Sequence, residues 1–63
     1  MKIDEIRSFS DEELLKRLEE AHEELLNLRF RLATKQLGNH REIPRVKKNI
    51  SQMKTIMKER NLT

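Results

Sequence analysis

The chain has 63 residues, 40% of them charged and 35% hydrophobic, and it contains no cysteine. These values predict a single small domain with a thin core, and they exclude disulfide bonds and thiolate metal ligands, the usual supports of so short a chain. The longest apolar run is two residues, so no segment is expected to span a membrane.

Charge is unevenly distributed along the sequence. Residues 1–28 carry four basic and nine acidic side chains, a net charge of −5, whereas residues 29–63 carry ten basic and two acidic ones, a net charge of +8. Charge asymmetry of this kind determines binding partners rather than the fold. A basic segment on a small chain indicates a polyanionic partner, most often a nucleic acid.

Residues 1–9 predict a short helical segment. Their apolar side chains, at Ile3, Ile6 and Phe9, are spaced three residues apart, which fits a single helical turn with one apolar face. This face needs a surface on which to pack. We expect the segment to fold back onto the following helix near Leu15.

A long helix is predicted to begin after Ser10. Ser10 and Glu13 fit a capping box, and acidic side chains in the first turn interact favourably with the helix dipole. Apolar residues then recur at alternating spacings of four and three, a seam typical of a helix that packs on another helix. Gly38 suits the left-handed conformation that ends a helix, so we expect the helix to span about residues 11–37. The seam residues are Leu14, Leu18, Ala21, Leu25, Leu28 and Leu32.

A second helix is predicted over about residues 41–60, after a turn at residues 38–40, with residues 61–63 frayed. Asn39 can cap it, and Pro44 is tolerated because the amides of the first helical turn lack intrahelical partners. Its seam is Ile43, Val46, Ile50, Met53 and Met57. From Leu18 onward the two seams form the predicted hairpin core. The expected fold is all-α: one domain, 1–63, built as a long antiparallel two-helix hairpin with a short N-terminal helical segment.

The first helix carries a second apolar stripe that the hairpin does not cover. Leu26, Phe30 and Leu37 lie about 100–140° around the helix from the first seam. Residues 1–9 are too short to reach Phe30 or Leu37. We therefore expect Leu26, Phe30 and Leu37 to form a surface for a protein partner.

Antiparallel pairing should concentrate positive charge at the tip of the hairpin. Glu20 and Glu24 come alongside Lys54 and Lys58, so charges balance there, whereas basic side chains of both helices meet near the turn. Arg and Lys neutralise phosphates, and two aromatic residues offer little stacking on bases, so a structured nucleic acid read through its backbone is expected. The basic residues expected at this level are Arg29, Arg31, Lys35, Arg41, Arg45, Lys47 and Lys48.

The sequence predicts neither an enzyme nor a metal site. His22 and His40 have no second ligand at a useful spacing, so we interpret them as a helix-flank and a turn residue. Gly38 is the only glycine, which excludes a glycine-rich phosphate loop. A two-helix hairpin also offers no concave pocket for a small-molecule substrate. We expect no catalytic residue, cofactor or metal.

The most specific motif is the block Leu28-Arg29-Phe30 followed by a turn that contains Gln36-Leu37 and Asn39. Together with neighbouring positions it closely resembles the bacterial-type ribosomal protein twenty-nine of the large subunit, the uL29 family. The resemblance covers nearly the whole chain, including the acidic capping region. The other matching positions are Glu24, Leu25, Leu26, Asn27, Ala33, Thr34, Ile43, Val46, Lys47, Lys48, Ile50 and Thr55.

The resemblance implies a structural, non-catalytic component of the large ribosomal subunit, in the cytoplasm. It implies a hairpin bound to rRNA of the subunit's first domain beside the exit of the nascent-chain tunnel. It also implies a neighbour, tunnel-exit ribosomal protein twenty-three, and proximity to docking sites of nascent-chain chaperones and targeting factors. The rRNA-binding candidates are Arg29, Lys35, Gln36, Asn39, Arg41, Arg45, Lys47, Lys48 and Thr55.

The sequence departs from the pattern of that family in three places. Lys35 stands where the family commonly has glycine, and Pro44 where a basic residue is frequent. Ser51-Gln52 replaces a usual Ala-Arg pair. The changes at Pro44 and Gln52 remove two cations, whereas Lys35 adds one.

Two other functions fit parts of the sequence. A self-associating coiled-coil adaptor would use the second apolar stripe for pairing. A DNA-binding hairpin fits the basic charge, but the sequence lacks a base-reading helix on a three-helix scaffold. The adaptor is therefore the main alternative to the ribosomal role.

Overall fold

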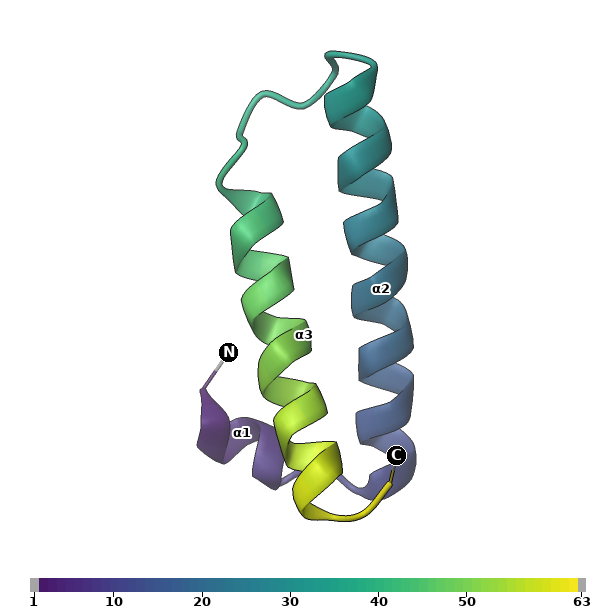
Figure 1. Cartoon of the computed structure of the whole chain (residues 1–63), viewed down its shortest axis with the longest axis vertical. Helices are drawn as coiled ribbons and strands as arrows, with labels where there is room; N and C mark the ends of the chain where they lie inside the picture. Colours follow the sequence, from purple (N-terminus) through teal and green to yellow (C-terminus); the bar gives the residue numbers. More distant parts are fainter. Residues whose placement is uncertain (1, 63) are drawn as a thin grey trace.

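The computed structural model describes residues 2–62, which form three helices and no strand. Helix α1 spans Ile3–Arg7, α2 spans Asp11–Ala33 and α3 spans Glu42–Glu59. The long helices α2 and α3 lie antiparallel, and α1 lies beside the C-terminal half of α3 (Figure 1). The molecule is elongated, with extents of 38 Å, 18 Å and 14 Å. The predicted all-α hairpin with a short N-terminal helix is confirmed.

The start of α2 follows the local motif at Ser10. The Ser10 backbone is extended, and the Glu13 amide donates a hydrogen bond to Ser10 Oγ at 3.2 Å. Acidic residues from Asp11 to Glu13 occupy the first turn, where the helix dipole favours negative charge. A serine cap of this kind stabilises a helix by about 1 kcal/mol. Residues within one turn therefore explain where α2 begins.

Helix α2 ends at Ala33, which is four residues before the expected end at residue 37. Lys35 adopts the left-handed conformation with φ of 60°, whereas Gly38 has no positive φ. A side chain in this conformation costs about 1–2 kcal/mol, because its Cβ approaches a backbone oxygen. Hydrogen bonds to the last carbonyls of the helix compensate for this strain. They run from Lys35 N to Leu32 O (3.0 Å), Gln36 N to Arg31 O (2.8 Å) and Thr34 Oγ1 to Phe30 O (3.1 Å).

Helix α3 begins at Glu42, one residue from the expected start, with Arg41 at the N-cap position. Asn39 does not cap the helix as expected. Its Oδ1 accepts a hydrogen bond from the Arg41 amide at 3.0 Å, which closes a turn just before α3. Pro44 lies in the first turn, where its missing amide hydrogen costs no helical hydrogen bond.

The end of α3 is closed rather than frayed. Asn61 adopts the left-handed conformation with φ of 59°, and the Leu62 amide donates to the Met57 carbonyl at 2.9 Å. The Leu62 side chain packs against the core. This pairing of a left-handed residue with an apolar contact is a common helix C-cap. Thr63, also expected to fray, lies outside the described residues.

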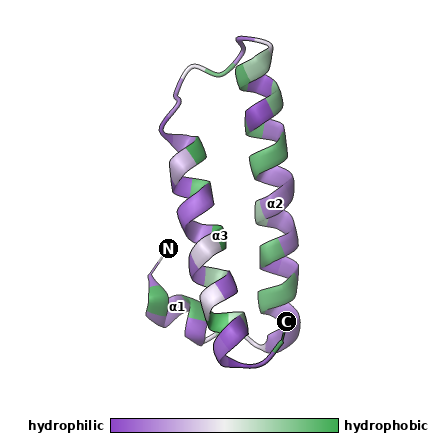
Figure 2. Cartoon of the chain, viewed as in Figure 1, coloured by the Kyte–Doolittle hydropathy of each residue, from purple (hydrophilic) through white to green (hydrophobic). Residues whose placement is uncertain are grey.

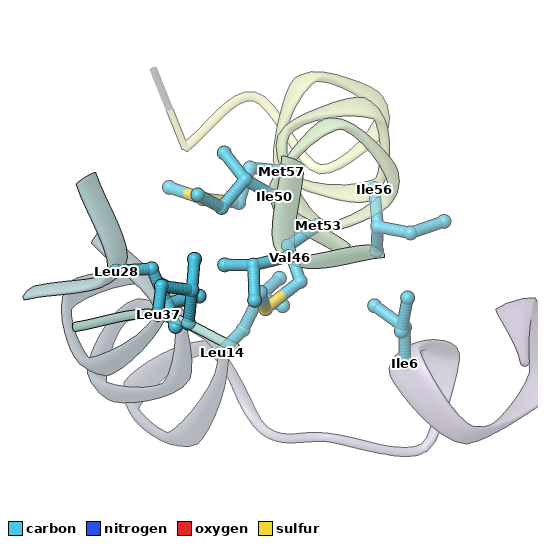
Figure 3. Close-up of a cluster of buried hydrophobic side chains, with 10 residues drawn as sticks. Ile6, Leu14, Leu28, Leu37, Val46, Ile50, Met53, Ile56 and Met57 are labelled. Carbon is cyan, nitrogen blue, oxygen red and sulfur yellow. The ribbon is translucent and has the colours of Figure 1, made fainter. Parts of the chain in front are cut away.

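The core lies between α2 and α3 and continues beneath α1. Apolar and hydrophilic residues alternate along both long helices (Figure 2), and the buried side chains converge between them (Figure 3). The prediction that Leu32 belongs to the core is wrong, since Leu32 is 38% exposed. Ile56, outside the predicted seam, is fully buried. The buried residues are Ile6, Leu14, Ala21, Leu28, Leu37, Val46, Ile50, Met53, Ile56 and Met57, against which Leu18, Leu25 and Ile43 pack.

The connection between the long helices spans residues 34–41 rather than the expected 38–40. It runs back along the hairpin, so α2 extends beyond the start of α3 (Figure 1). The exposure of Leu32 follows, because no helix lies opposite the end of α2. The placement of Leu37 on a partner surface is also wrong. Leu37 is only 8% exposed, because α2 has ended before it and the connection directs its side chain into the core.

Helix α1 packs mainly on α3 rather than on α2 near Leu15, which remains 46% exposed. Ile6 is fully buried and lies next to Ile56 of α3 (Figure 3). Arg60, just after α3, links the end of α3 to α1 and to the start of α2. Its guanidinium donates to the carbonyls of Phe9 (2.8 Å) and Arg7 (2.9 Å) and to Asp11 Oδ1 (3.1 Å).

Candidate nucleic-acid interface

The nine residues predicted to bind rRNA are all exposed. They come from three parts of the chain: the last turns of α2, the connection, and the outer surface of α3. The connection supplies four of the nine, because a segment outside regular structure turns most of its side chains to solvent. The nine residues are Arg29, Lys35, Gln36, Asn39, Arg41, Arg45, Lys47, Lys48 and Thr55.

Most cations near the connection have no carboxylate partner. Within residues 2–62, Arg45 is the one predicted RNA-binding residue that forms an ion pair, with Glu24 at 3.8 Å. Glu42 is the one acidic residue within the connection and the first turn of α3. Unpaired exposed cations keep their charge available for phosphates. We call this set the basic tip: Arg29, Arg31, Lys35, Arg41, Lys47 and Lys48.

The opposite end of the hairpin differs in its electrostatics. Three of the four ion pairs among the described residues lie there, where α1, the start of α2 and the end of α3 meet. They are Arg7–Glu59 at 3.6 Å, Arg17–Glu13 at 3.3 Å and Arg60–Asp11 at 3.1 Å. Arg17 also lies over the Phe9 ring, 4.9 Å from its centroid. Arg7, Arg17 and Arg60 at this end are thus paired with carboxylates, whereas the six cations of the basic tip are not.

Arg45 lies at a different level from the one predicted. The sequence places it beside Arg29 and Arg31, but the structure places it beside Glu24, further from the end of α2. The longer connection accounts for this shift, because α3 begins below the end of α2 (Figure 1). Arg45 is therefore paired, unlike the cations of the basic tip, which lie on both sides of it, at Arg41 before it and at Lys47 and Lys48 after it.

Thr55 and Gln52 lie away from the basic tip. Thr55 is roughly 20 Å along α3 from Glu42, at 1.5 Å per residue. Its hydroxyl donates to the Ser51 carbonyl at 2.9 Å, so it has no second proton for a phosphate oxygen. Gln52 is partly buried, and its Oε1 is covered and lacks a hydrogen-bond partner in the described part of the chain. Neither residue joins the cationic cluster.

A separate apolar surface is formed by Leu26 and Phe30, one helical turn apart on α2. Leu26 is 71% exposed and Phe30 is 65% exposed. They lie on the side of α2 that α3 does not cover, as the second stripe predicted. Leu37 does not contribute to this surface, because it is buried. Exposed side chains of this size on neighbouring turns are typical of a protein contact.

Residues 2–62 contain neither a metal site nor a membrane-spanning helix. No three histidine, cysteine, aspartate or glutamate residues come close enough together to hold a metal ion. None of the helices combines the length and the apolar character that crossing a membrane requires.

Comparison with known proteins shows the family to which this chain belongs. The model of the family described as "Ribosomal L29 protein" matches residues 4–60. The chain belongs to the L29 family. The resemblance found in the sequence is thereby confirmed, and it extends over the hairpin and α1. Members of the L29 family are structural, non-enzymatic components, so this chain has a structural role in the ribosome.

Curated L29-family relatives match the chain almost from end to end. The large ribosomal subunit protein uL29 of Dehalococcoides mccartyi is 55% identical over 62 residues, which cover 98% of this chain and 95% of the relative. That of Finegoldia magna is 55% identical over 98% of this chain and 91% of its own length. That of Streptomyces griseus is 52% identical over 97% and 82%.

Proposed function

We propose that this L29-family protein is a constituent of the large ribosomal subunit that binds rRNA through the basic tip. The observation that supports this most strongly is the asymmetry of ion pairing. The six cations of the basic tip have no carboxylate partner within residues 2–62, whereas the three arginines Arg7, Arg17 and Arg60 at the opposite end are each paired with a carboxylate. A surface of this kind binds phosphates and releases their counterions, which makes the affinity depend steeply on salt.

The tip offers contacts to the RNA backbone rather than to bases. Lysine and arginine side chains neutralise phosphates, and Gln36 and Asn39 add side-chain amides that donate hydrogen bonds. The Oδ1 of Asn39 already accepts from the Arg41 amide, which leaves the NH₂ group of this exposed residue available as a donor. Phe30 is the one strongly exposed aromatic residue, so stacking on single-stranded bases contributes little. Folded rRNA of the first domain is the target that the family resemblance implies.

The apolar surface of Leu26 and Phe30 contacts a protein neighbour in the same assembly. Phe30 lies between Arg29 and Arg31 on α2, at the level of the basic tip, and Leu26 lies one turn before it. Successive side chains of a helix point about 100° apart, so RNA and protein can contact different sides of α2 together. The family resemblance implies tunnel-exit ribosomal protein twenty-three as this neighbour. A position at the tunnel exit in the cytoplasm would also bring the chain close to nascent-chain chaperones and targeting factors.

A salt titration of rRNA binding tests the proposal. Filter binding is measured between this chain and a large-subunit rRNA fragment containing the first domain, at several salt concentrations. The variant changes Arg41, Lys47 and Lys48 to Glu, and the matched control changes Lys16, Lys54 and Lys58 to Glu. All six side chains are exposed, and those of the control lie away from the connection.

Specific binding by the unchanged chain and the control, with at least about a hundredfold loss in the tip variant, is the expected result. Absence of binding by the unchanged chain, or equal losses in both variants, would refute the proposal. Analytical ultracentrifugation of the free chain tests the alternative function, a self-associating coiled-coil adaptor. A tight homodimer that Phe30→Ala dissociates, without RNA binding, would favour that alternative.

A further inference from the structure

The connection between α2 and α3 is held by one apolar side chain. Leu37 is the single buried residue of residues 34–41, at 8% exposure, and every other residue of this segment is exposed. Leu37 belongs to the same cluster as Leu28 of α2 and Val46 of α3, and it is drawn beside Leu28 in Figure 3. The connection is therefore fixed to both long helices through Leu37.

Backbone hydrogen bonds direct the Leu37 side chain into the hairpin. The amides of Gln36 and Leu37 both donate to the Arg31 carbonyl, at 2.8 Å and 3.2 Å. Together with the left-handed Lys35, these bonds reverse the chain immediately after α2. Leu37 then lies inside, while Gln36 on one side and Gly38 on the other face solvent.

The rest of the connection has little packing of its own. A methyl group at Gly38 would meet no atom within 4 Å, so this part of the chain lies in open space. Beyond Gly38, the hydrogen bond between Asn39 Oδ1 and the Arg41 amide ties those two residues to each other but not to α2. Arg41 is also the N-cap residue of α3, where its carbonyl accepts from the Arg45 amide at 3.4 Å. The place of Asn39 and Arg41 relative to Lys35 and Gln36 therefore depends on Leu37 together with the packing of α3 on α2.

We propose that Leu37 is a positioning residue for RNA binding, which holds the polar side chains at 35, 36, 39 and 41 in one fixed arrangement. This inference rests on the proposed binding of rRNA by the basic tip. When the competent arrangement of a site is populated only in part, the apparent dissociation constant rises by the inverse of that fraction. A Leu37 variant that frees the connection should weaken RNA binding without removing any group that contacts RNA.

The test compares Leu37→Ala with a conservative variant and a control. Leu37→Met keeps an apolar side chain of similar size, and Leu14→Ala truncates a fully buried leucine at the opposite end of the hairpin. RNA affinity and its salt dependence are measured at a temperature where circular dichroism shows each variant to be helical. Trypsin cleavage after Lys35 and Arg41, relative to cleavage after Lys54, reports the mobility of the connection without RNA.

Leu37→Ala is expected to bind RNA about tenfold more weakly, with the salt slope of the unchanged chain, and to be cleaved faster in the connection. Leu37→Met and folded Leu14→Ala should bind within about twofold of the unchanged chain. If Leu37→Ala cannot be made helical, the proteolysis comparison uses Leu37→Val, with the same expected direction.

Two results separate the possible failures. If the unchanged chain binds no rRNA, both the proposed function and the positioning role of Leu37 are refuted. If it binds rRNA and Leu37→Ala binds equally well, or if the cleavage of Leu37→Ala in the connection is unchanged, only the positioning role is refuted. Equal losses in Leu14→Ala and Leu37→Ala would also refute it, because they would indicate a general effect of stability.

Discussion

The guanidinium of Arg45 lies 3.8 Å from the carboxylate of Glu24, which joins the first turns of α3 to the middle of α2. This pair marks the level at which the two long helices meet, and it partly neutralises Arg45, which lies between Arg41 and Lys47 of the basic tip. Both side chains are more than half exposed, at 60% and 52%. The pair therefore affects RNA binding more than stability, since exposed ion pairs contribute about 0–1 kcal/mol.

Replacing Glu24 by Gln should strengthen RNA binding by about two- to threefold, because it frees Arg45 and removes a negative charge near the tip. The free energy of unfolding should change by less than about 0.5 kcal/mol. Filter binding and urea unfolding measure the two effects. Glu12→Gln, an exposed acid at the opposite end, is the control and should leave the affinity unchanged. Weaker binding by Glu24→Gln would mean instead that Glu24 orients Arg45 toward RNA.

Replacing Lys35 by Gly should change stability and RNA affinity in opposite directions. Glycine adopts the left-handed conformation without strain, so the free energy of unfolding should rise by about 0.5–1 kcal/mol. Loss of the cation should weaken RNA binding and reduce the salt slope by about one phosphate contact. Lys35→Ala separates the two effects, because it removes the cation and keeps the strain. Equal stability of the Gly and Ala variants would contradict the role assigned to the backbone.

Replacing Arg60 by Ala should destabilise the chain by about 2 kcal/mol, since three hydrogen bonds to Phe9, Arg7 and Asp11 are lost. Its side chain is only 25% exposed, so solvent replaces these bonds poorly. Arg60→Lys should recover little of the loss, because an ammonium cannot donate from a planar fork to several acceptors. Urea unfolding measures both variants. A loss below about 0.5 kcal/mol would show that α1 is held by its apolar contacts alone.

Replacing Phe30 by Ala should change the free energy of unfolding by less than about 0.5 kcal/mol, because the ring is 65% exposed. Met53→Ala, at a fully buried position, should cost about 2–5 kcal/mol by the same measurement. Binding of the purified protein-twenty-three neighbour should weaken at least about tenfold in Phe30→Ala. A large loss of stability in that variant would show that Phe30 supports the fold rather than a contact.

Features that depend on a few neighbouring residues could be predicted from the sequence. The capping motif at Ser10 places the start of α2, and the spacing of Ile3 and Ile6 indicates α1. The tolerance of Pro44 follows from its place in the first turn of α3. The family was also recognisable, because its motifs cover nearly the whole chain.

Features that depend on distant contacts could not be predicted. The end of α2 is set by a lysine in a conformation that usually selects glycine, so Gly38 gave a misleading signal. Because α2 ends at Ala33, Leu37 lies outside the helix and α3 begins further down α2 than expected. Arg45 therefore lies beside Glu24. Ile56 is buried by α1, which packs on α3 rather than near Leu15. No local sequence pattern specifies the helix on which α1 packs.

The most direct test of RNA binding through the basic tip is incorporation into the large subunit. Cells express tagged chain with Arg41, Lys47 and Lys48 changed to Glu, or with the control changes at Lys16, Lys54 and Lys58, and large subunits are sedimented after a high-salt wash. The unchanged chain and the control should remain with the subunit, whereas the tip variant should stay at the top of the gradient while retaining its helical circular dichroism. Normal retention of the helical tip variant would contradict RNA binding through the basic tip.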